Sequence, residues 1–172
     1  MKGAFLVIDM LKDFILPEGR LYIGEKGAEI IDPIKKHMQE ARERRNHVIF
    51  ICDRHFSQDG EFQLFPPHCL EGTQGAEVIE ELKPARGDIV IPKRRFSSFF
   101  GTDLDLTLRE LEVEELYLAG VVTNICILYT AADARMLNYK VNVYQEAVAS
   151  FNPKAHNFAL QEMKSTLGVN IL

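Results

Sequence analysis

Apolar residues in this chain occur in two patterns, as short unbroken runs and as stretches in which they recur every three or four positions. Unbroken runs of four to seven residues are typical of strands that are buried on both faces of a sheet. They predict strands at 3–9, 48–52, 88–91, 115–119, 140–145 and 169–172. We expect Pro92 to end the third strand, because proline cannot donate a hydrogen bond to a neighbouring strand.

Helical spacing fills the stretches between these runs. The segment 25–45 predicts an amphipathic helix, with one apolar side formed by Ile30, Ile34, Met38 and Ala41. Further helices are predicted at 75–82, at 102–111 with Thr102 as the cap, and at 124–137, where apolar residues on nearly all sides predict a central, buried helix. Asn152 followed by Pro153 predicts the start of a last helix, which reaches Thr166.

The alternation of strands and helices predicts the fold class. It favours parallel βαβ units that form an α/β three-layer sandwich, with a central, mostly parallel sheet of about six strands. The 172 residues fit a single domain spanning 1–172. Residues 54–74 show no clear periodicity, and a segment of that length without regular structure is usually functional.

Composition and charge indicate which functions and which cellular location fit the protein. A formal net charge of −5 argues against nucleic-acid binding, which needs basic side chains to neutralise phosphates. We find no secretory signal, and no apolar run long enough to span a membrane. The three cysteines Cys52, Cys69 and Cys126 are an odd number without the spacing of a disulfide framework, which suits reduced thiols. These features predict a soluble cytoplasmic protein.

Reactive side chains gather where the predicted strands end. In parallel α/β sheets, ligands bind beyond the carboxyl ends of the strands. Asp9 ends the first strand, Asp53 and His55 follow the second, Lys93 follows the third, and Cys126 comes soon after the fourth. A thiol, a lysine and carboxylates at one edge of the sheet predict an active site.

Cys126 is the candidate nucleophile of this site. It is expected in the first turn of the helix 124–137, where free backbone N–H groups and the positive helix end favour a thiolate. With Lys93 nearby, a pKa lowered by about two units would stabilise the thiolate by roughly 2.7 kcal/mol. The same backbone amides could hold an oxyanion. Asp9 is the candidate base that moves protons to the leaving group.

A second group predicts a divalent metal site. Asp53 and His55 point the same way from an extended strand end, and His68 follows 13 residues after His55. Two imidazoles and a carboxylate that leave open positions are typical of a catalytic zinc or similar ion. Glu61 or Asp59 could supply a further ligand, directly or through water.

The other histidines and the phenylalanines near the strand ends have more ordinary interpretations. His37, on the exposed side of the first helix, His47 and His156 are expected to be structural or solvated. Phe14, Phe65 and Phe96 are candidates for the walls of a pocket for a flat aromatic substrate, as are Phe99 and Phe100.

Four segments of the chain resemble one family. The stretch 120–134, GVVTNICILYTAADA, looks like the nucleophile segment of isochorismatase-like cysteine hydrolases. IDMLKDF at 8–14 and KRRFSSFFGTDLD at 93–105 are also similar to that family. FPPHCLEGTQGAE at 65–77, preceded by DRH, is similar to the metal loop of nicotinamidases in particular. The resemblance runs in order over nearly the whole chain.

This resemblance implies a function and roles for the residues. It implies an Asp9–Lys93–Cys126 triad and a divalent metal on Asp53, His55 and His68, with zinc first and iron or manganese as alternatives. It implies attack of Cys126 on the carboxamide of nicotinamide, whose pyridine nitrogen docks at the metal. It also implies a cis peptide before Val122, so that the N–H groups of Val122 and Cys126 form the oxyanion hole. By analogy with the family, the protein is a homo-oligomer.

Three positions depart from the nicotinamidase pattern and leave the substrate open. Phe65 stands where tryptophan is common, Phe96 where tyrosine is common, and Ile125 where a polar residue is common. They keep the pocket apolar and remove hydrogen bonds. The alternatives to a nicotinamidase are a related hydrolase of another small amide or carbamoyl compound, and a metal-binding or thiol-sensing domain without catalysis.

Overall fold

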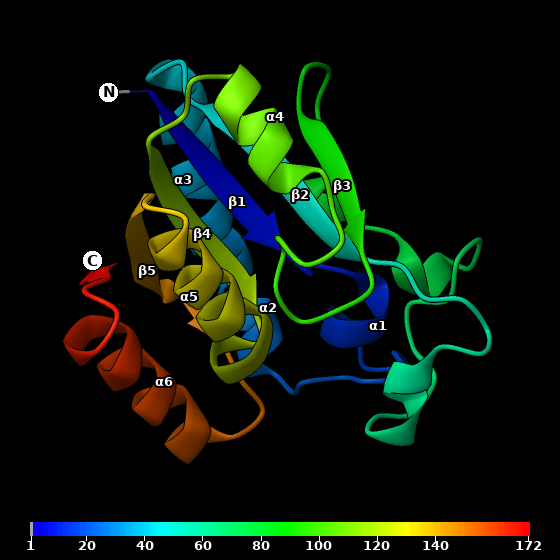
Figure 1. The fold of residues 1–172 in the computed structure, drawn as a ribbon. Helices are drawn as coiled ribbons and strands as arrows, with labels where there is room; N and C mark the ends of the chain where they lie inside the picture. Colours follow the sequence, from blue (N-terminus) through cyan, green and yellow to red (C-terminus); the bar gives the residue numbers. More distant parts are fainter. Residues whose placement is uncertain (1) are drawn as a thin grey trace.

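The computed structural model describes residues 2–172, and six parallel strands form its central sheet (Figure 1). The strands are β1 (Gly3–Ile8), β2 (His47–Asp53), β3 (Ile89–Lys93), β4 (Glu115–Val121), β5 (Lys140–Ala149) and β6 (Asn170–Ile171). Their order across the sheet is β3-β2-β1-β4-β5-β6. The predicted α/β class with a mostly parallel, roughly six-stranded sheet is confirmed.

Helices cover both faces of the sheet. They are α1 (Lys12–Ile15), α2 (Lys26–Glu29), α3 (Ile31–Glu43), α4 (Leu104–Glu110), α5 (Leu128–Met136) and α6 (Pro153–Ser165). Alternate residues of β1 point to opposite faces. Leu6 and Ile8 belong to a core shared with α4, α5 and α6, whereas Phe5 and Val7 belong to a core shared with α1 and α3. The two cores make the three layers of the sandwich.

The predicted helix 25–45 is interrupted. It is divided at Ile30 into α2 and α3, and Pro33 lies in the first turn of α3. Proline is tolerated in the first turn of a helix but not in its interior, so the longer helix begins anew just before it. His37, expected near the exposed side of the helix, is instead 7% exposed, because it faces β5 and stacks on Tyr144.

The helix predicted at 75–82 is wrong. Only short 3-10 turns occur there, η2 (Gln74–Ala76) and η3 (Glu80–Leu82). The backbone between them bonds to the segment after β1 instead of to itself: the Lys12 N–H donates to the Glu77 carbonyl (2.9 Å) and the Ile79 N–H to the Met10 carbonyl (3.1 Å). Tertiary pairing has replaced the local helix.

Two further boundaries differ from the prediction. Pro92 does not end β3 but lies inside it, which is possible because β3 is the edge strand and its outer side needs no partner. The helix predicted from Thr102 begins at Leu104, although the Thr102 hydroxyl still accepts a hydrogen bond from the Leu104 N–H (3.2 Å). The cap predicted at Asn152 is confirmed, since its side chain accepts from the N–H groups of Lys154 and Ala155.

The segment predicted as one buried helix, 124–137, has two parts. A π-helical turn, η4 (Thr123–Ile127), precedes α5. The expected complete burial is wrong, because Tyr129 is 50% and Met136 70% exposed. The helix is the outer layer of the sandwich, so one of its sides faces solvent even though that side is apolar.

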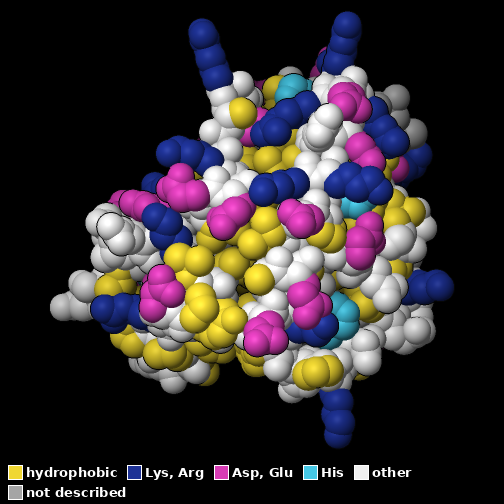
Figure 2. Space-filling model, turned by 180° about the vertical axis from the view of Figure 1, so that it is seen from behind, with side chains coloured by type: hydrophobic (Ala, Val, Ile, Leu, Met, Phe, Trp, Pro, Cys, Tyr) yellow, Lys and Arg dark blue, Asp and Glu magenta, His cyan; other side chains and the backbone are white. Residues whose placement is uncertain are grey.

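The side of the molecule behind the sheet carries charges of both signs. Basic and acidic side chains lie among one another around a central hydrophobic area (Figure 2). The cluster Arg42, Arg44 and Arg45 on and after α3 is exposed, and Arg42 pairs with Asp88 (2.6 Å). These three side chains therefore form a solvated face at the end of the helix. Within residues 2–172, none of the helices has the length and apolar character needed to cross a membrane.

The sheet order determines where a ligand can reach the strand ends. From β1 the chain proceeds to β2 and β3 on one side, and later to β4, β5 and β6 on the other. The order therefore reverses between β1 and β4, and in open α/β sheets such a switch point opens a crevice beyond the carboxyl ends. Asp9 and Cys126 follow these two strands.

Candidate active site

Asp9 lies at the switch point, directly after β1. Its φ of 54° is in the left-handed region, which aspartate adopts more readily than most residues. The Asp9 N–H donates to the Ile51 carbonyl (2.9 Å), and the Asp9 carboxylate accepts from the Asp53 N–H (2.9 Å). The turn after β1 is therefore fastened to the end of β2.

Lys93 connects the carboxylates and the thiol. It is the last residue of β3 and pairs in register with Asp53, the last residue of β2. Its buried ammonium Nζ lies 2.8 Å from Asp9 Oδ2 and 3.4 Å from Cys126 Sγ, and it donates a short hydrogen bond to Asp53 Oδ1. The three residues predicted as a triad, Asp9, Lys93 and Cys126, thus meet in one place.

The pKa values of this group reflect burial and mutual charge. Burial, followed by the nearby Asp53 carboxylate, raises the pKa of Asp9 to about 6, although Lys93 opposes the shift. Burial opposes ionisation of Asp53 as well, but the Lys93 ammonium and the two nearby imidazoles hold its pKa well below the usual range. The pKa of Lys93 is raised despite burial, because Asp53 and Asp9 stabilise its charge.

The expected lowering of the Cys126 pKa is wrong. Burial raises the pKa of the thiol well above its usual value, Lys93 opposes this shift, and the Asp9 and Asp53 carboxylates add to it. The sequence indicates the lysine and the helix end, but it does not show that two carboxylates share the lysine. A thiol whose pKa is raised needs a base to accept its proton before the sulfur can attack.

The backbone around Cys126 has the shape that the family resemblance implies. The Val121–Val122 peptide bond is cis. Cys126 lies within the π-helical turn η4, and both Val122 and Cys126 line the same cleft as Asp9.

Four buried side chains beside the triad form a set of metal donors. Asp53, His55, Glu61 and His68 each offer one ligand atom, and these atoms all lie within 4.8 Å of one another. Asp53 Oδ2 lies 3.5 Å from His55 Nε2 and 3.6 Å from His68 Nε2, and His55 Nε2 lies 3.9 Å from Glu61 Oε1. The three predicted ligands come together, and of the two further candidates Glu61 joins them.

This donor set fits a divalent ion. At metal–ligand distances of about 2.1 Å, the atoms of a tetrahedral site lie about 3.4 Å apart, close to the separations above. His55 Nε2 and Glu61 Oε2 are buried without a hydrogen-bond partner, which is costly unless another group binds them. Three buried carboxylates, those of Asp9, Asp53 and Glu61, lie at this site with one buried ammonium, that of Lys93, and the excess of negative charge favours a cation.

The two histidines of the donor set each use their other ring nitrogen, Nδ1, for a hydrogen bond. His68 Nδ1 donates to the Pro66 carbonyl (2.8 Å), and His55 Nδ1 to Asp59 Oδ2 (3.2 Å). Both rings therefore present Nε2 to the common centre. Although burial opposes protonation, the Asp53 carboxylate raises the pKa of both imidazoles, so a metal ion has to displace protons to bind there.

An aromatic cleft adjoins the thiol and the donor set. Its empty space, the open mouth included, is about 340 Å³. Phe14, Phe65 and Phe96 line it, as the sequence predicts, and the rings of Phe65 and Phe96 meet edge to face with centroids 6.1 Å apart. The suggested roles of Phe99 and Phe100 are wrong: Phe99 packs on the core against Tyr139, and Phe100 points outward.

Sequence reasoning missed part of this lining. Leu21 and Phe151 also border the cleft. Leu21 lies in the irregular segment after α1, and Phe151 lies between β5 and α6. Neither position has a local signal, apart from the location of Phe151 after a strand end, where ligand sites are expected.

Comparisons with known proteins agree with this geometry. The chain matches the family model of the isochorismatase domain over residues 3–171. It is similar to the crystal structure of the nicotinamidase/pyrazinamidase PncA from Bacillus subtilis, with a TM-score of 0.94, 39% identity and 99% of each chain covered. It is also similar to the pyrazinamidase of Pyrococcus horikoshii in complex with zinc, with a TM-score of 0.94 and 31% identity over 100% of this chain and 99% of that one. The ureidoacrylate amidohydrolase RutB of Serratia proteamaculans is 37% identical over 96% of this chain and 77% of its own length.

Proposed function

This chain belongs to the isochorismatase family of hydrolases, and from that premise we propose that it is a cysteine amidohydrolase that converts nicotinamide to nicotinate and ammonia. The observation that carries the proposal is the contact of one buried ammonium, that of Lys93, with both Asp9 (2.8 Å) and Cys126 (3.4 Å). The aromatic cleft and the donor set directly beside this contact support it further.

In the proposed reaction, Asp9 accepts the thiol proton as the sulfur of Cys126 attacks the carboxamide carbon. The N–H groups of Val122 and Cys126 stabilise the oxyanion, and preorganised donors of this kind contribute strongly to acyl transfer. Asp9 then passes the proton to the leaving nitrogen, and ammonia departs from a thioester. Water, deprotonated by Asp9, hydrolyses the thioester to nicotinate and restores the thiol.

Lys93 serves this reaction through its charge. Its ammonium stabilises the sulfur anion while the proton rests on Asp9, and it keeps Asp53 ionised for the metal site. An aromatic amide would lie among Phe14, Phe65 and Phe96, whose apolar rings suit a flat heteroaromatic ring.

Asp53, His55, His68 and Glu61 would hold the divalent ion, and the zinc complex of the Pyrococcus horikoshii pyrazinamidase supports zinc. When bound, the ion would supply a Lewis-acidic contact for the pyridine nitrogen of the substrate. The four donor side chains determine where the ion would meet the pyridine nitrogen, which is beside the cleft and not at the thiol.

The similarity to RutB favours a second candidate, hydrolysis of a carbamoyl compound by the same thiol. Phe65, Phe96 and Ile125 agree with either substrate, because they offer no hydrogen bonds that would select one. The donor set favours the first candidate, since it gives the ring nitrogen of nicotinamide a partner.

Ammonia release from nicotinamide, pyrazinamide and simple ureas tests the proposal. We expect kcat/KM to be highest for nicotinamide. Faster release from ureas would favour the carbamoyl candidate, and no release from any of them would favour a domain without catalysis.

Replacement of the thiol tests the nucleophile. We expect Cys126→Ala to lower kcat by about 10³-fold or more, because loss of a covalent nucleophile commonly costs that much, with an unchanged circular dichroism spectrum. Cys52→Ala is the matched control, because that thiol is buried in β2 away from the cleft, and it should retain activity. Full turnover by Cys126→Ala would remove the assignment.

A further inference from the structure

Asp59 lies outside the donor set but is bound to two of its members. Its side chain is completely buried and accepts four hydrogen bonds. Oδ2 accepts from His55 Nδ1 (3.2 Å) and Arg94 Nε (2.9 Å). Oδ1 accepts from the Glu61 N–H (3.0 Å) and Arg95 Nη1 (2.9 Å). With both oxygens occupied, Asp59 is not a ligand itself.

These bonds determine how two ligands are presented. Because a carboxylate can only accept, the bond to His55 Nδ1 places the proton on that nitrogen and leaves Nε2 free for the common centre. The bond to the Glu61 N–H makes Asp59 the cap of the short turn η1 (Gly60–Gln63), which carries the Glu61 side chain. One carboxylate therefore orients an imidazole and a second carboxylate together.

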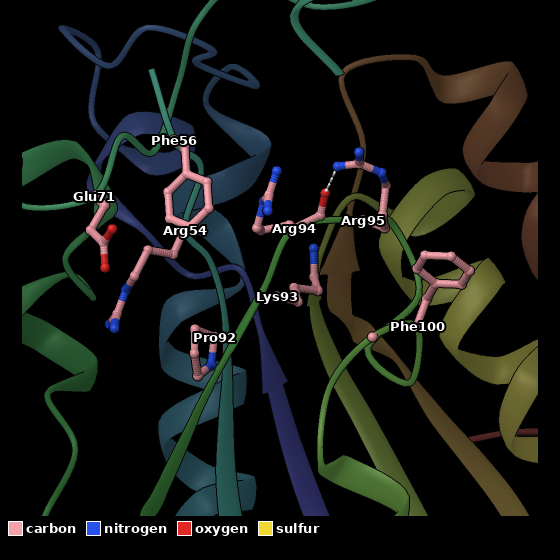
Figure 3. A pocket seen from close by; sticks show the side chains of 9 residues that line it. Arg54, Phe56, Glu71, Pro92, Lys93, Arg94, Arg95 and Phe100 are labelled. Atoms are coloured by element: carbon pink, nitrogen blue, oxygen red, sulfur yellow. Dashed lines mark hydrogen bonds between the residues drawn. The ribbon is translucent and has the colours of Figure 1, made fainter. Parts of the chain in front are cut away.

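Arg94 and Arg95 hold Asp59 from the other side. They directly follow Lys93 at the end of β3, and Figure 3 shows both arginines, with the hydrogen bond from Arg95 to the Arg94 carbonyl. The Arg94 guanidinium also stacks over the Phe56 ring, 4.2 Å from its centroid. The strand that delivers Lys93 to the thiol thus also carries the two cations that fasten Asp59.

We propose that Asp59 is a positioning residue of the metal centre, which fixes the tautomer and ring direction of His55 and the location of Glu61 while Arg94 and Arg95 clamp it in place. This inference rests on the proposed metal centre. Carboxylates that orient a ligating histidine commonly change metal affinity by about 10–100-fold. Asparagine cannot replace Asp59, because its NH₂ group would face two donors in place of an acceptor oxygen.

Metal affinity and ligand geometry, measured without any substrate, test the inference. The probes are Zn²⁺, titrated against a chromophoric chelator, and the visible spectrum of the Co²⁺-loaded protein. We expect Asp59→Asn to weaken Zn²⁺ binding by about 10–100-fold and to change the Co²⁺ spectrum. Glu71→Gln is the matched control: it removes one negative charge from the same loop at an exposed side chain, and should bind Zn²⁺ within about twofold of wild type.

A second variant covers the case in which Asp59→Asn does not fold. Arg94→Gln with Arg95→Gln removes the clamp through side chains that are 44% and 43% exposed. We expect a smaller loss of Zn²⁺ affinity, about 3–10-fold, with a shifted Co²⁺ spectrum, because Asp59 remains but is free to turn. Wild-type affinity and an unchanged spectrum in the variants that fold would overturn the role of Asp59 alone. Absence of Zn²⁺ and Co²⁺ binding in the wild type would overturn the metal centre and this inference with it.

Discussion

At the scale of single residues, the informative feature is how protons are distributed among the carboxylates, the lysine and the thiol of the site. The Lys93 ammonium lies beside two carboxylates and a thiol, and it helps to hold the pKa of Asp53 well below its usual range. Burial raises the pKa of Asp9 to about 6 and raises the pKa of the Cys126 thiol, and Lys93 opposes both shifts. A carboxylate with a pKa near 6 is ionised at neutral pH but is still a better proton acceptor than an ordinary aspartate, which suits a general base.

This distribution of protons predicts that activity falls at low pH. Asp9 must be ionised to accept the thiol proton, and its pKa is raised to about 6. We expect kcat/KM for nicotinamide to fall about tenfold per pH unit below 6, and Asp9→Asn to remove most activity at every pH. The profile is measured between pH 4.5 and 8.

Protonation of Asp9 would not unfold the protein, so acid unfolding at this residue does not explain such a fall in activity. A carboxyl group whose pKa is raised in the folded state binds its proton more tightly there than in the unfolded chain. Its contribution to stability is thus present at low pH and lost as the pH rises through about 6. A profile that stays flat down to pH 5, with the protein folded by circular dichroism, would contradict the role of Asp9.

At the scale of secondary-structure elements, the junction of β1 and β4 brings Asp9 near Cys126. Gly120 near the end of β4 has a φ of 117°, and a Cβ atom there would lie 2.0 Å from the Ile8 carbonyl oxygen. The pairing of β4 with β5 is also irregular between Leu118 and Gly120. The two central strands can end this close together only without a side chain at position 120.

Gly120→Ala should therefore destabilise the fold. Both the left-handed backbone and the clash with the backbone of β1 oppose alanine, so we expect a loss of about 2 kcal/mol or more in the free energy of unfolding. For a chain of this size, that lowers Tm by about 4–8 °C. Gly60→Ala, where nothing lies within 4 Å of an added Cβ, should change Tm by less than about 2 °C. Equal Tm values for the two variants would contradict the close approach.

At the scale of the whole molecule, the donor set connects the sheet to the irregular segment. Asp53 ends β2, Glu61 lies in η1, and His68 lies beyond it. Within residues 54–74, the structure shows the turn η1 and an isolated bridge between His55 and Leu70. An ion bound to these residues would link this segment to the sheet. Because the ligands come together only in the folded chain, the ion would bind the folded state alone.

Metal removal should thus lower stability. Binding to the folded state alone adds about 2.7 kcal/mol when the free ion is at 100 times its dissociation constant. We expect about one ion per chain by elemental analysis. By calorimetry, we expect a lower Tm after chelation and recovery of Tm on addition of Zn²⁺. His68→Ala should respond weakly to both treatments. Metal-replete wild type without bound ion and with an unchanged Tm would contradict the donor set.

The sequence alone determined the strand order along the chain, the α/β class and the residues that end the strands. These features follow from local patterns: unbroken apolar runs make buried strands, and parallel strands bring Asp9, Asp53, Lys93 and Cys126 to one edge wherever the helices lie. The cap at Asn152 is equally local, because it involves only the next three residues.

Tertiary structure decided the features that depend on neighbours distant in the chain. Pro92 could stay in a strand because β3 is at the edge, and 75–82 lost its helix to pairing with the segment after β1. Burial raised the pKa of the Cys126 thiol, and the Asp9 and Asp53 carboxylates added to the shift. Asp59 became a support instead of a ligand because Arg94 and Arg95 occupy its oxygens. Charge and hydrogen bonding act through distances in space, and only the folded chain determines those distances.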